Sequence, residues 1–520
     1  MILLTPYPFR VEEKQGQFSL PQPLPALDEY LQGKLPAWLH IRTQADLHIA
    51  GCAMDEAYRL TVTQDGIRID AATEAGAFYG YISLMQLAHA YRDAIPCMNI
   101  EDAPRYTYRG FLMDVGRYFY PLEDLYKIAD MCALHKINYL HWHLTEDQGW
   151  RIEIRRYPLL ATKGSMRSHT NFNCKPHGGF YSQRDVRAFV EYCRARHITV
   201  IPEIDMPGHM QAAMACYPYL GCFDRELPVA THWGVKHDIL CAGKETTYRF
   251  VYDVLDEVCE LFDSPYIHLG GDEAPKFRWK LCPHCQAKMR ELGLQDENEL
   301  QSYFMNRIAK YLQTKGRTAI MWNEEVPTGR CDRALNWQVW HVGDEANRRK
   351  IVDELQKSGR KIVYSVCAHT YLDLPYRQVP VRACYDTDPA ADLQVDAANV
   401  LGIEAALWTE YVPDMQKAMR MSMPRLGALS ESMWSPPAGK VFANYTDRIP
   451  AFNAFLQSQG LQPAPMRRAF PAAPVAIAED LWFRRRPLHW HGLHNLVDDI
   501  RVKRLVKRMA MRPTNLKSDK

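Results

Sequence analysis

Residues 108–144, YRGFLMDVGRYFYPLEDLYKIADMCALHKINYLHWHL, predict the fold class of this chain. Two apolar, β-prone runs, residues 108–115 and 138–144, enclose a segment in which Leu125, Ile128 and Cys132 recur at the spacing of one helix face. Two strands joined by a helix indicate neighbouring parallel strands, because a parallel pair needs a long crossover connection. The sequence therefore predicts an α/β domain that begins near residue 105.

The same unit recurs toward the C-terminus. The β-prone runs are residues 108–115, 138–144, 198–204, 266–271, 317–322, 336–340, 361–366 and 401–408. Eight such runs, alternating with amphipathic segments over roughly 300 residues, favour a closed (β/α)8 TIM barrel. A doubly wound open sheet is the competing architecture, and the absence of a GxGxxG motif after a strand weakens it only slightly.

The length of 520 residues implies more than one structural unit, because single cores seldom exceed about 300 residues. We expect a small N-terminal α+β domain over residues 1–104, the barrel over 105–440, and a C-terminal helical, basic extension over 441–520. In the first unit, residues 58–62 and 66–69 predict a hairpin. A helix through Phe78, Tyr81, Ile82 and Met85 should follow, and residues 96–104 are interpreted as a linker.

Composition excludes several classes of protein. A hydrophobic fraction of 47% and a charged fraction of 24% are ordinary for a soluble globular protein, and a net charge of +2 gives no strong bias toward nucleic acid or membrane. No apolar run is long enough for a membrane span, and the N-terminal run is too short for a signal sequence. We expect a cytoplasmic enzyme whose 14 cysteines are reduced thiols.

The basic excess lies entirely in the last 40 residues, which carry 11 Lys+Arg against 3 Asp+Glu. Residues 481–520 contain Arg484–Arg486 and Arg501–Arg508, with apolar residues between the charges. A peripheral helix that packs on the barrel or on a partner subunit is the favoured interpretation. Binding to a membrane surface or to a polyanionic substrate is the alternative.

Reactive side chains gather where the predicted strands end. They are Asp114, Arg117, His143, Glu146, Asp147, Asp205, His209, Asp272, Glu273, Trp322, Glu324, Trp340, Tyr371, Asp373, Trp408 and Glu410. In a barrel these positions converge on the face where the βα loops build the active site. Tryptophan rings stack on the apolar face of a sugar, while carboxylates and arginine bind its hydroxyls. The pattern therefore indicates a carbohydrate site.

The segment IHLGGDEAPKFRW, residues 267–279, places two carboxylates side by side. Glycosidic cleavage needs an acid for the leaving oxygen and stabilisation of positive charge at the anomeric carbon. Neighbours on one strand point in different directions, so the pair is poorly placed for the usual two-carboxylate mechanism. We interpret Glu273 as the acid/base. Asp272 would then polarise a substrate 2-acetamido group that is itself the nucleophile, and Tyr371 would bond its carbonyl.

Four motifs together resemble glycoside hydrolase family 20, the β-N-acetylhexosaminidases. They are RGFLMDVGRYF, HWHLTEDQGWR, PEIDMPGHMQA and HLGGDE, in this order, within a resemblance that spans residues 50–435. The resemblance implies a small N-terminal α/β domain before the barrel and substrate-assisted catalysis. Nothing in the sequence suggests a nucleotide cofactor, and this chemistry requires no metal. A homodimer is compatible with the family, although no motif demonstrates one.

The resemblance also implies roles for individual residues. Glu273 matches the general acid/base, and Asp272 matches the residue that orients the acetamido N–H. Arg117 matches the arginine at the O3 and O4 side of the terminal sugar, and His209 matches the histidine beside the carboxylates. The remaining substrate contacts are carried over to Trp322, Trp340, Trp408, Tyr371, Asp373 and Glu410. Glu146 departs from the pattern, because the family usually has aspartate there, and its longer side chain would adjust the pocket or its hydrogen bonds.

Two other functions compete with exo-acting release of N-acetylglucosamine and N-acetylgalactosamine. A lacto-N-biosidase would release a disaccharide and would need a pocket two sugars long. A catalytically silent carbohydrate-binding protein is disfavoured because Asp272, Glu273 and Arg117 are all present. Cys282-Pro-His-Cys285 is interpreted as a local turn with free thiols rather than as a zinc or redox site, since no second CxxC motif exists.

Overall fold

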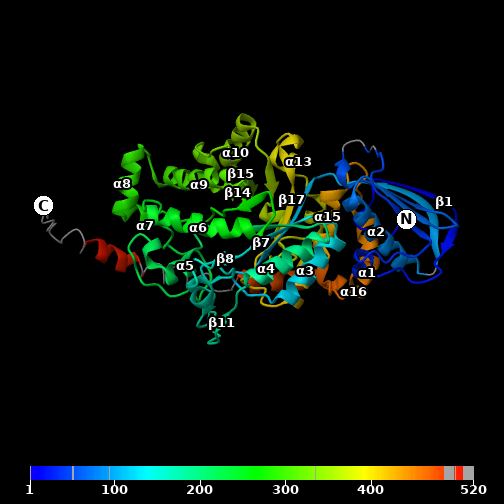
Figure 1. Ribbon diagram of the computed structural model, residues 1–520, viewed down its shortest axis with the longest axis horizontal. Coiled ribbons are helices and arrows are strands. Elements are labelled where there is room, and N and C mark those ends of the chain that lie inside the picture. The colour runs from blue at the N-terminus through cyan, green and yellow to red at the C-terminus, as the bar shows by residue number, and fades with distance from the viewer. Residues whose placement is uncertain are drawn as a thin grey trace.

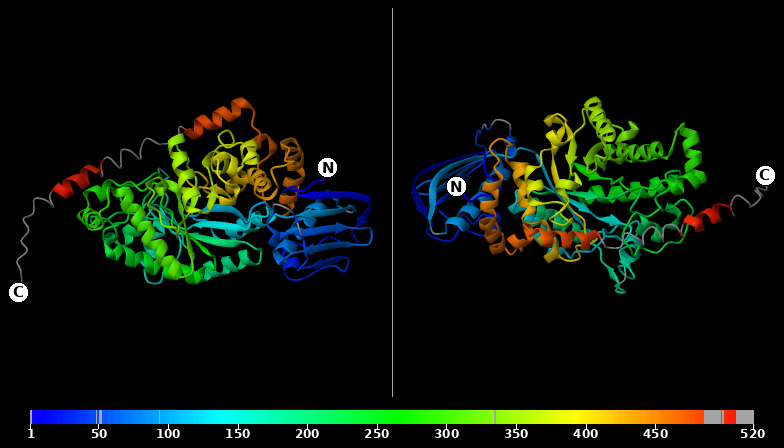
Figure 2. Two further views of the ribbon diagram at one scale, coloured as in Figure 1. Left: turned by 90° about the horizontal axis from the view of Figure 1, so that it is seen from above. Right: turned by 180° about the vertical axis from the view of Figure 1, so that it is seen from behind.

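The computed structural model describes residues 2–47, 49, 52–92, 94–171, 173–333, 335–484, 497 and 499–507. The molecule is elongated, with an N-terminal sheet domain at one end and the barrel in the middle (Figure 1). The helix formed by residues 499–507 lies at the opposite end from the N-terminal domain (Figure 2).

The centre of the molecule is a closed barrel of eight parallel strands. In chain order they are β6 (Tyr108–Asp114), β7 (Tyr139–His143), β12 (Thr199–Glu203), β13 (Tyr266–His268), β14 (Thr318–Trp322), β15 (Leu335–Val339), β16 (Ile362–Tyr364) and β17 (Val400–Leu407). Each strand pairs with the next, and β17 closes the ring onto β6. The predicted (β/α)8 barrel is confirmed, and every predicted strand is present.

Helices surround the barrel, and shorter helices lie within the connections between its strands. The longer ones are α3 (Leu122–Leu134), α4 (Gln183–Arg194), α6 (Glu245–Leu261), α8 (Pro283–Leu292), α9 (Glu297–Thr314), α10 (Glu345–Ser358) and α15 (Arg425–Trp434). The shorter ones are α5 (Gln211–Cys216), α7 (Phe277–Leu281), α11 (Cys367–Thr370), α12 (Val381–Asp386), α13 (Pro389–Leu393) and α14 (Met415–Ser422). Two small ribbons, β8 (Thr145–Glu146) with β9 (Gly149–Trp150) and β10 (Met166–Arg167) with β11 (His177–Gly178), project from the loops.

The N-terminal domain is a five-stranded sheet with α2 (Glu74–Tyr91) against it. The strands lie in the order β1 (Arg10–Ser19), β5 (Ala94–Asp102), β3 (Tyr58–Val62), β4 (Ile67–Ala71) and β2 (Leu39–Arg42), and α1 (Leu27–Leu31) lies beside them. The predicted hairpin is confirmed as β3 and β4, and the predicted helix as α2.

The interpretation of residues 96–104 as a linker is wrong. Most of that segment belongs to β5, which pairs with β1 on one side and β3 on the other. Pro96 was misleading, because proline cannot donate to a sheet ladder. The strand accommodates it beside the bulge of β1 between Glu13 and Gln17, where the pairing register shifts.

The N-terminal domain packs on the end of the barrel where the strands begin. Arg109, near the start of β6, forms an ion pair with Glu56 at 2.6 Å. Lys136, just before β7, reaches Asp102 at 3.0 Å, and both side chains are buried. These contacts leave the opposite face of the barrel, where the strands end, free for the βα loops.

The chain after the barrel packs back onto both domains. Arg448 of α16 (Phe442–Ser458) forms a buried ion pair with Glu431 of α15 and also bonds the carbonyl of Leu4. After α17 (Met466–Ala469) and α18 (Ala473–Arg484), residues 499–507 are helical. Asp499 of this segment accepts from Arg278 of α7 at 2.8 Å, so the segment packs on the barrel loops. Arg485, Arg486 and Arg508, from the predicted basic tail, lie outside the described residues.

Among the described residues, no helix combines the length and the apolar character that crossing a bilayer would require.

Candidate active site

The end of β6 is fastened to the end of β17 by Asp114. One carboxylate oxygen of Asp114 accepts from the backbone N–H of Gly116 at 2.8 Å, which shapes the turn that carries Arg117. The other oxygen accepts from the backbone and hydroxyl of Thr409, both at 2.9 Å. This clamp holds Arg117 next to Trp408 and Glu410, which come from the far end of the sequence.

Arg117 begins a chain of charged contacts that runs across the site. Its guanidinium lies 2.9 Å from Glu146, 3.8 Å from Glu410 and 5.0 Å from the centre of the Trp408 ring. The other oxygen of Glu146 accepts from His209 Nδ1 at 2.8 Å. Burial opposes ionisation of Glu146, but Arg117 and His209 hold the pKa of this carboxyl well below its usual range. Glu146 is therefore a buried anion behind Arg117 and His209, and we infer that it positions both.

Asp272 and Glu273 lie on a sharp turn after β13, not on the strand itself. Gly270 and Gly271 adopt positive φ angles of 66° and 104°, and Glu273 follows with a φ of 45°. A side chain at Gly270 would overlap the carboxylate of Asp205, so only glycine fits this approach. The premise that the two acids alternate along a strand is wrong, because this turn brings one oxygen of each within 4.8 Å of the other.

The two carboxylates differ in exposure, and His209 joins them. Nε2 of His209 lies 3.7 Å from an oxygen of Asp272 and 3.7 Å from an oxygen of Glu273. The Asp272 side chain is 15% exposed, whereas that of Glu273 is 43% exposed. Burial raises the pKa of Asp272 to about 6, His209 opposes the rise, and Glu273 adds to it. An outer carboxyl suits proton transfer to a leaving group, and an inner one suits contact with the bound sugar.

Aromatic side chains from four strand ends form one cluster. Trp322 is almost fully buried and lies 5.9 Å from Trp408, measured between ring centres. Trp340 and Tyr371 lie outside them with nearly parallel rings, 6.3 Å apart. Burial raises the pKa of Tyr371 well above its usual value, so its hydroxyl stays a hydrogen-bond donor. The indole N–H of Trp340 donates to Glu324 at 3.0 Å.

Buried polar atoms that make no hydrogen bond to the protein lie around this cluster. Among the described residues they include Arg117 Nη1, His209 Nε2, Asp272 Oδ1, Glu324 Oε2 and Asp373 Oδ1. Buried polar groups are normally hydrogen-bonded, so a convergent set without partners indicates a site for a polar ligand.

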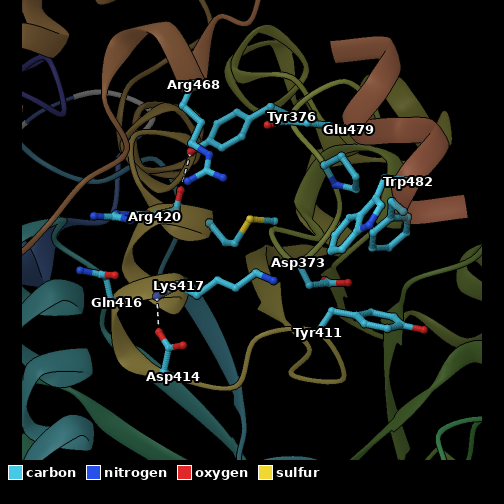
Figure 3. Close-up of a pocket in the computed structure, with 13 residues that line it drawn as sticks. Asp373, Tyr376, Tyr411, Asp414, Gln416, Lys417, Arg420, Arg468, Glu479 and Trp482 are labelled. Atoms are coloured by element: carbon cyan, nitrogen blue, oxygen red, sulfur yellow. Dashed lines mark hydrogen bonds between the residues drawn. The ribbon is translucent and has the colours of Figure 1, made fainter. Parts of the chain in front are cut away.

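Asp373 joins this site to a neighbouring cavity. Burial raises the pKa of Asp373 to about 8, and the nearby charge of Glu410 adds to the effect. The cavity has a volume of about 520 Å³, and Asp373 and Tyr411 lie across from Trp482 of α18 in it (Figure 3). The cavity therefore presents the aromatic rings of Tyr411 and Trp482 beside Asp373.

A second layer of carboxylate and histidine lies beneath the pocket, inside the barrel. Glu203 accepts from His143 Nδ1 at 2.5 Å and from the indole N–H of Trp322 at 3.0 Å. Burial lowers the pKa of His141, but the charges of Glu404 and Glu203 outweigh this effect and raise that pKa to about 9. Glu203 and Glu404 are parts of the site that were not predicted from the sequence. An acidic residue within an otherwise apolar strand, as in GIEAAL of β17, could have identified them, because a buried carboxylate needs polar partners.

The structure brings all the predicted site residues to one end of the barrel, where Glu146 contacts Arg117 through one oxygen and His209 through the other. Their roles toward a substrate remain predictions that follow from this geometry. Trp322 lies deepest, under Trp408, and so forms the base of the aromatic cluster.

Fold and site together define a carbohydrate-active barrel enzyme with acid chemistry at the carboxyl ends of its strands. The model "Glycosyl hydrolase family 20, catalytic domain" matches residues 106–437, and "Glycosyl hydrolase family 20, domain 2" matches residues 28–103. The chain belongs to glycoside hydrolase family 20, and its barrel is the catalytic domain of a β-N-acetylhexosaminidase.

Relatives support the same assignment. A beta-hexosaminidase from Porphyromonas gingivalis is 41% identical over 76% of this chain, which covers 53%, about half, of that relative's length. A beta-hexosaminidase from Akkermansia muciniphila is 33% identical over 79% of this chain and 87% of its own. A beta-N-acetylhexosaminidase structure from Bacteroides fragilis aligns with a TM-score of 0.79 at 31% identity, over 90% of this chain and 98% of that one.

Replacing Arg117 by lysine should weaken catalysis without unfolding the protein. Lysine keeps the charge but loses the planar fork that faces Glu146 and Glu410 and stacks near Trp408. We expect kcat/KM to fall roughly ten- to hundredfold, the value of about 1.5–3 kcal/mol for a charged hydrogen bond. Arg349→Lys, at an exposed position on α10, is the control and should be neutral. An Arg117→Lys enzyme with unchanged kcat/KM would remove Arg117 from substrate binding.

Proposed function

We propose that this chain is an exo-acting, anomer-retaining enzyme that releases terminal β-linked N-acetylglucosamine, and N-acetylgalactosamine as well, from oligosaccharides or glycoconjugates. The observation that carries the proposal is the turn after β13, which holds the carboxylates of Asp272 and Glu273 close together. There an inner carboxylate, Asp272, has an unpartnered buried oxygen, and an outer carboxyl, Glu273, lies at the mouth of the site. This division matches a mechanism in which the substrate supplies its own nucleophile.

In the first step Glu273 donates a proton to the glycosidic oxygen as the C1–O bond breaks. The carbonyl oxygen of the substrate's acetamido group attacks C1 from the opposite face and closes an oxazolinium ring. Asp272 accepts the acetamido N–H and stabilises the positive charge that spreads over the ring. Tyr371, held protonated by burial, donates to the same carbonyl oxygen and orients it for attack.

In the second step Glu273, now a carboxylate, removes a proton from water. The water attacks C1 from the side that the leaving group occupied, and the ring opens to restore the acetamido group. Two inversions at C1 give net retention of configuration. His209, which contacts both carboxylates, holds the pair in place through both steps.

Replacing the acetyl group of the substrate by fluorinated acetyl groups tests the internal nucleophile. Each fluorine withdraws electrons from the carbonyl oxygen and weakens its attack. We expect kcat/KM to fall steadily with each added fluorine on an aryl glycoside series. Insensitivity to fluorination would mean that the acetamido oxygen does not attack, and Asp272 would then be the candidate nucleophile.

The alternative activity, release of a disaccharide by a lacto-N-biosidase, is separated by product size. An exo-acting enzyme should give only monosaccharide from the first minutes of reaction with a chitooligosaccharide. A disaccharide as the first product would favour the alternative. N-acetylglucosamine and N-acetylgalactosamine differ only in the configuration at C4, and we expect Arg117, Asp373 and Glu410 to contact the oxygen there. The proposal predicts that aryl glucosaminide and galactosaminide substrates are both hydrolysed.

The acid limb of the pH profile should report Asp272. Its pKa of about 6 lies above the ordinary aspartate value, so the carboxyl becomes protonated, and unable to accept the acetamido N–H, as the pH falls through about 6. We therefore expect kcat/KM to decline below about pH 6.

Because His209 lowers the pKa of Asp272, His209→Gln should move this limb to higher pH. His89→Gln, on α2 of the N-terminal domain, is the control and should leave the limb in place. A limb that stays near pH 4 in the wild-type enzyme would assign the limiting ionisation to another group.

A further inference from the structure

Four cysteines that are distant in sequence meet in the loops beside the active site. Cys222 and Cys241 come from the long connection after β12, whereas Cys282 and Cys285 flank the start of α8. All four side chains are buried. Their sulfur atoms all lie within 4.8 Å of one another. Spacing in the sequence concealed this cluster, because only one of its two halves has the CxxC form.

The sulfur separations match those of a tetrahedral metal site. Cys241 Sγ lies 3.7 Å from Cys282 Sγ and 3.6 Å from Cys285 Sγ, and Cys222 Sγ lies 4.0 Å from Cys285 Sγ. A Zn–S bond of about 2.3 Å implies sulfur–sulfur edges of about 3.8 Å in a regular tetrahedron. A disulfide would need sulfur atoms about 2.05 Å apart, so the arrangement is that of four separate thiols.

The backbone around the cluster is built for close approach. Cys282 is the N-cap residue of α8, and Cys285 lies in its first turn, where the helix dipole favours negative charge. Gly243 lies against this turn so closely that a side chain there would come within 2.4 Å of the Cys285 backbone nitrogen. The loop that carries Cys241 therefore reaches the helix only because residue 243 is glycine.

We propose that Cys222, Cys241, Cys282 and Cys285 bind one structural Zn²⁺ ion as four thiolates. Binding releases the four thiol protons and leaves all the ligand positions filled by sulfur, so the ion takes no water and performs no chemistry on the substrate. Four soft sulfur ligands and no oxygen ligand select zinc over magnesium, calcium or manganese.

The site would fix the two loops that carry the catalytic groups. Cys282 follows Glu273 by nine residues, and the indole N–H of Trp279, between them, donates to the carbonyl of Leu240 at 2.9 Å. The backbone N–H of Leu240 in turn bonds the carbonyl of Pro207 at 2.9 Å, two residues before His209. Zinc would thus fix the position of the His209 loop relative to the Asp272–Glu273 turn. Its role would be to position catalytic groups and not to react.

The first test measures zinc in the intact enzyme. We expect about one zinc ion per chain by elemental analysis after extensive dialysis, and Cys222, Cys241, Cys282 and Cys285 should resist alkylation in the native protein but react in the unfolded, chelated protein. Replacement of the bound zinc by Co²⁺ should give the absorption bands of a tetrahedral cobalt thiolate. No bound metal with four alkylatable thiols, or two disulfides in their place, would overturn the proposal.

The second test uses variants with a matched control. Cys282→Ala/Cys285→Ala should lose most of the bound zinc, whereas Cys132→Ala, at an equally buried cysteine of α3, should keep it. Full zinc content in the double variant would contradict the site. Zinc content and the cobalt spectrum do not depend on turnover, so this proposal and the proposed activity can fail separately.

The positioning role has its own readout. Partial removal of zinc with a chelator should lower kcat in proportion to the metal lost and should leave KM nearly unchanged. Restoring zinc should recover kcat. Activity that stays constant as zinc is removed would show that the ion, though bound, does not order the catalytic loops.

Discussion

Glu273→Gln is expected to lower kcat about 10²–10⁴-fold on substrates with poor leaving groups, the usual contribution of general acid catalysis. Glutamine keeps the size of the side chain at the exposed position beside His209 but has no proton to give. Aryl substrates with strongly acidic leaving groups need less protonation, so their first step should suffer far less. The product sugar should still bind, because Arg117 and the tryptophans are untouched.

The measurement is a comparison of kcat across a series of aryl leaving groups in the wild-type and variant enzymes. Dependence of the rate on the leaving-group pKa should be much steeper in Glu273→Gln. Glu345→Gln on α10, an exposed glutamate that pairs with Arg348 and Arg349, should behave as wild type. A variant that retains full activity toward poor leaving groups would refute the acid/base assignment.

Asp272→Asn should give a different pattern of loss. The carboxylate, whose Oδ1 atom is buried, is lost, so the positive charge of the oxazolinium ring has no counter-charge within hydrogen-bond reach. A deleted transition-state contact of this type costs about 10²–10³ in kcat, and the loss should persist for activated leaving groups because ring closure itself is impaired. The measurement is kcat on the same aryl series as for Glu273→Gln.

The contrast between the two variants is the informative result. Asp386→Asn, an exposed aspartate on α12, serves as the control. If Asp272→Asn hydrolyses activated substrates at the wild-type rate, ring formation does not need Asp272, and its place in the mechanism must be given up.

Much of the fold follows from local sequence pattern. Apolar runs such as residues 198–204 alternate with amphipathic helices. This alternation of strand and helix is enough to predict a parallel sheet. Proline and glycine caused the errors. Pro96 obscured a strand because the bulge that tolerates it lies in β1, more than seventy residues upstream in the sequence. Gly270 and Gly271 ended β13 at His268, whereas the apolar run continues to Leu269.

The site could be predicted because barrel topology converts a position in sequence into a position in space. Residues after successive strands share one face, so Arg117 and Glu410 could be paired although 293 positions separate them. Contacts among loops obey no such rule. The thiols of Cys222 and Cys241 meet Cys282 through tertiary packing alone, and the turn that aims Glu273 depends on a positive φ angle that no periodicity encodes.

Substrate assistance requires the acetamido group at C2, so removal of that group from the substrate should nearly abolish turnover. The enzyme is given an aryl 2-acetamido-2-deoxy-β-glucoside and the matching aryl β-glucoside, which differ only at C2. We predict hydrolysis of the acetamido substrate and a rate for the plain glucoside lower by at least ~10³-fold, because the internal nucleophile is absent. Comparable kcat/KM values for both would mean that a protein carboxylate attacks C1, and would contradict the role given to Asp272.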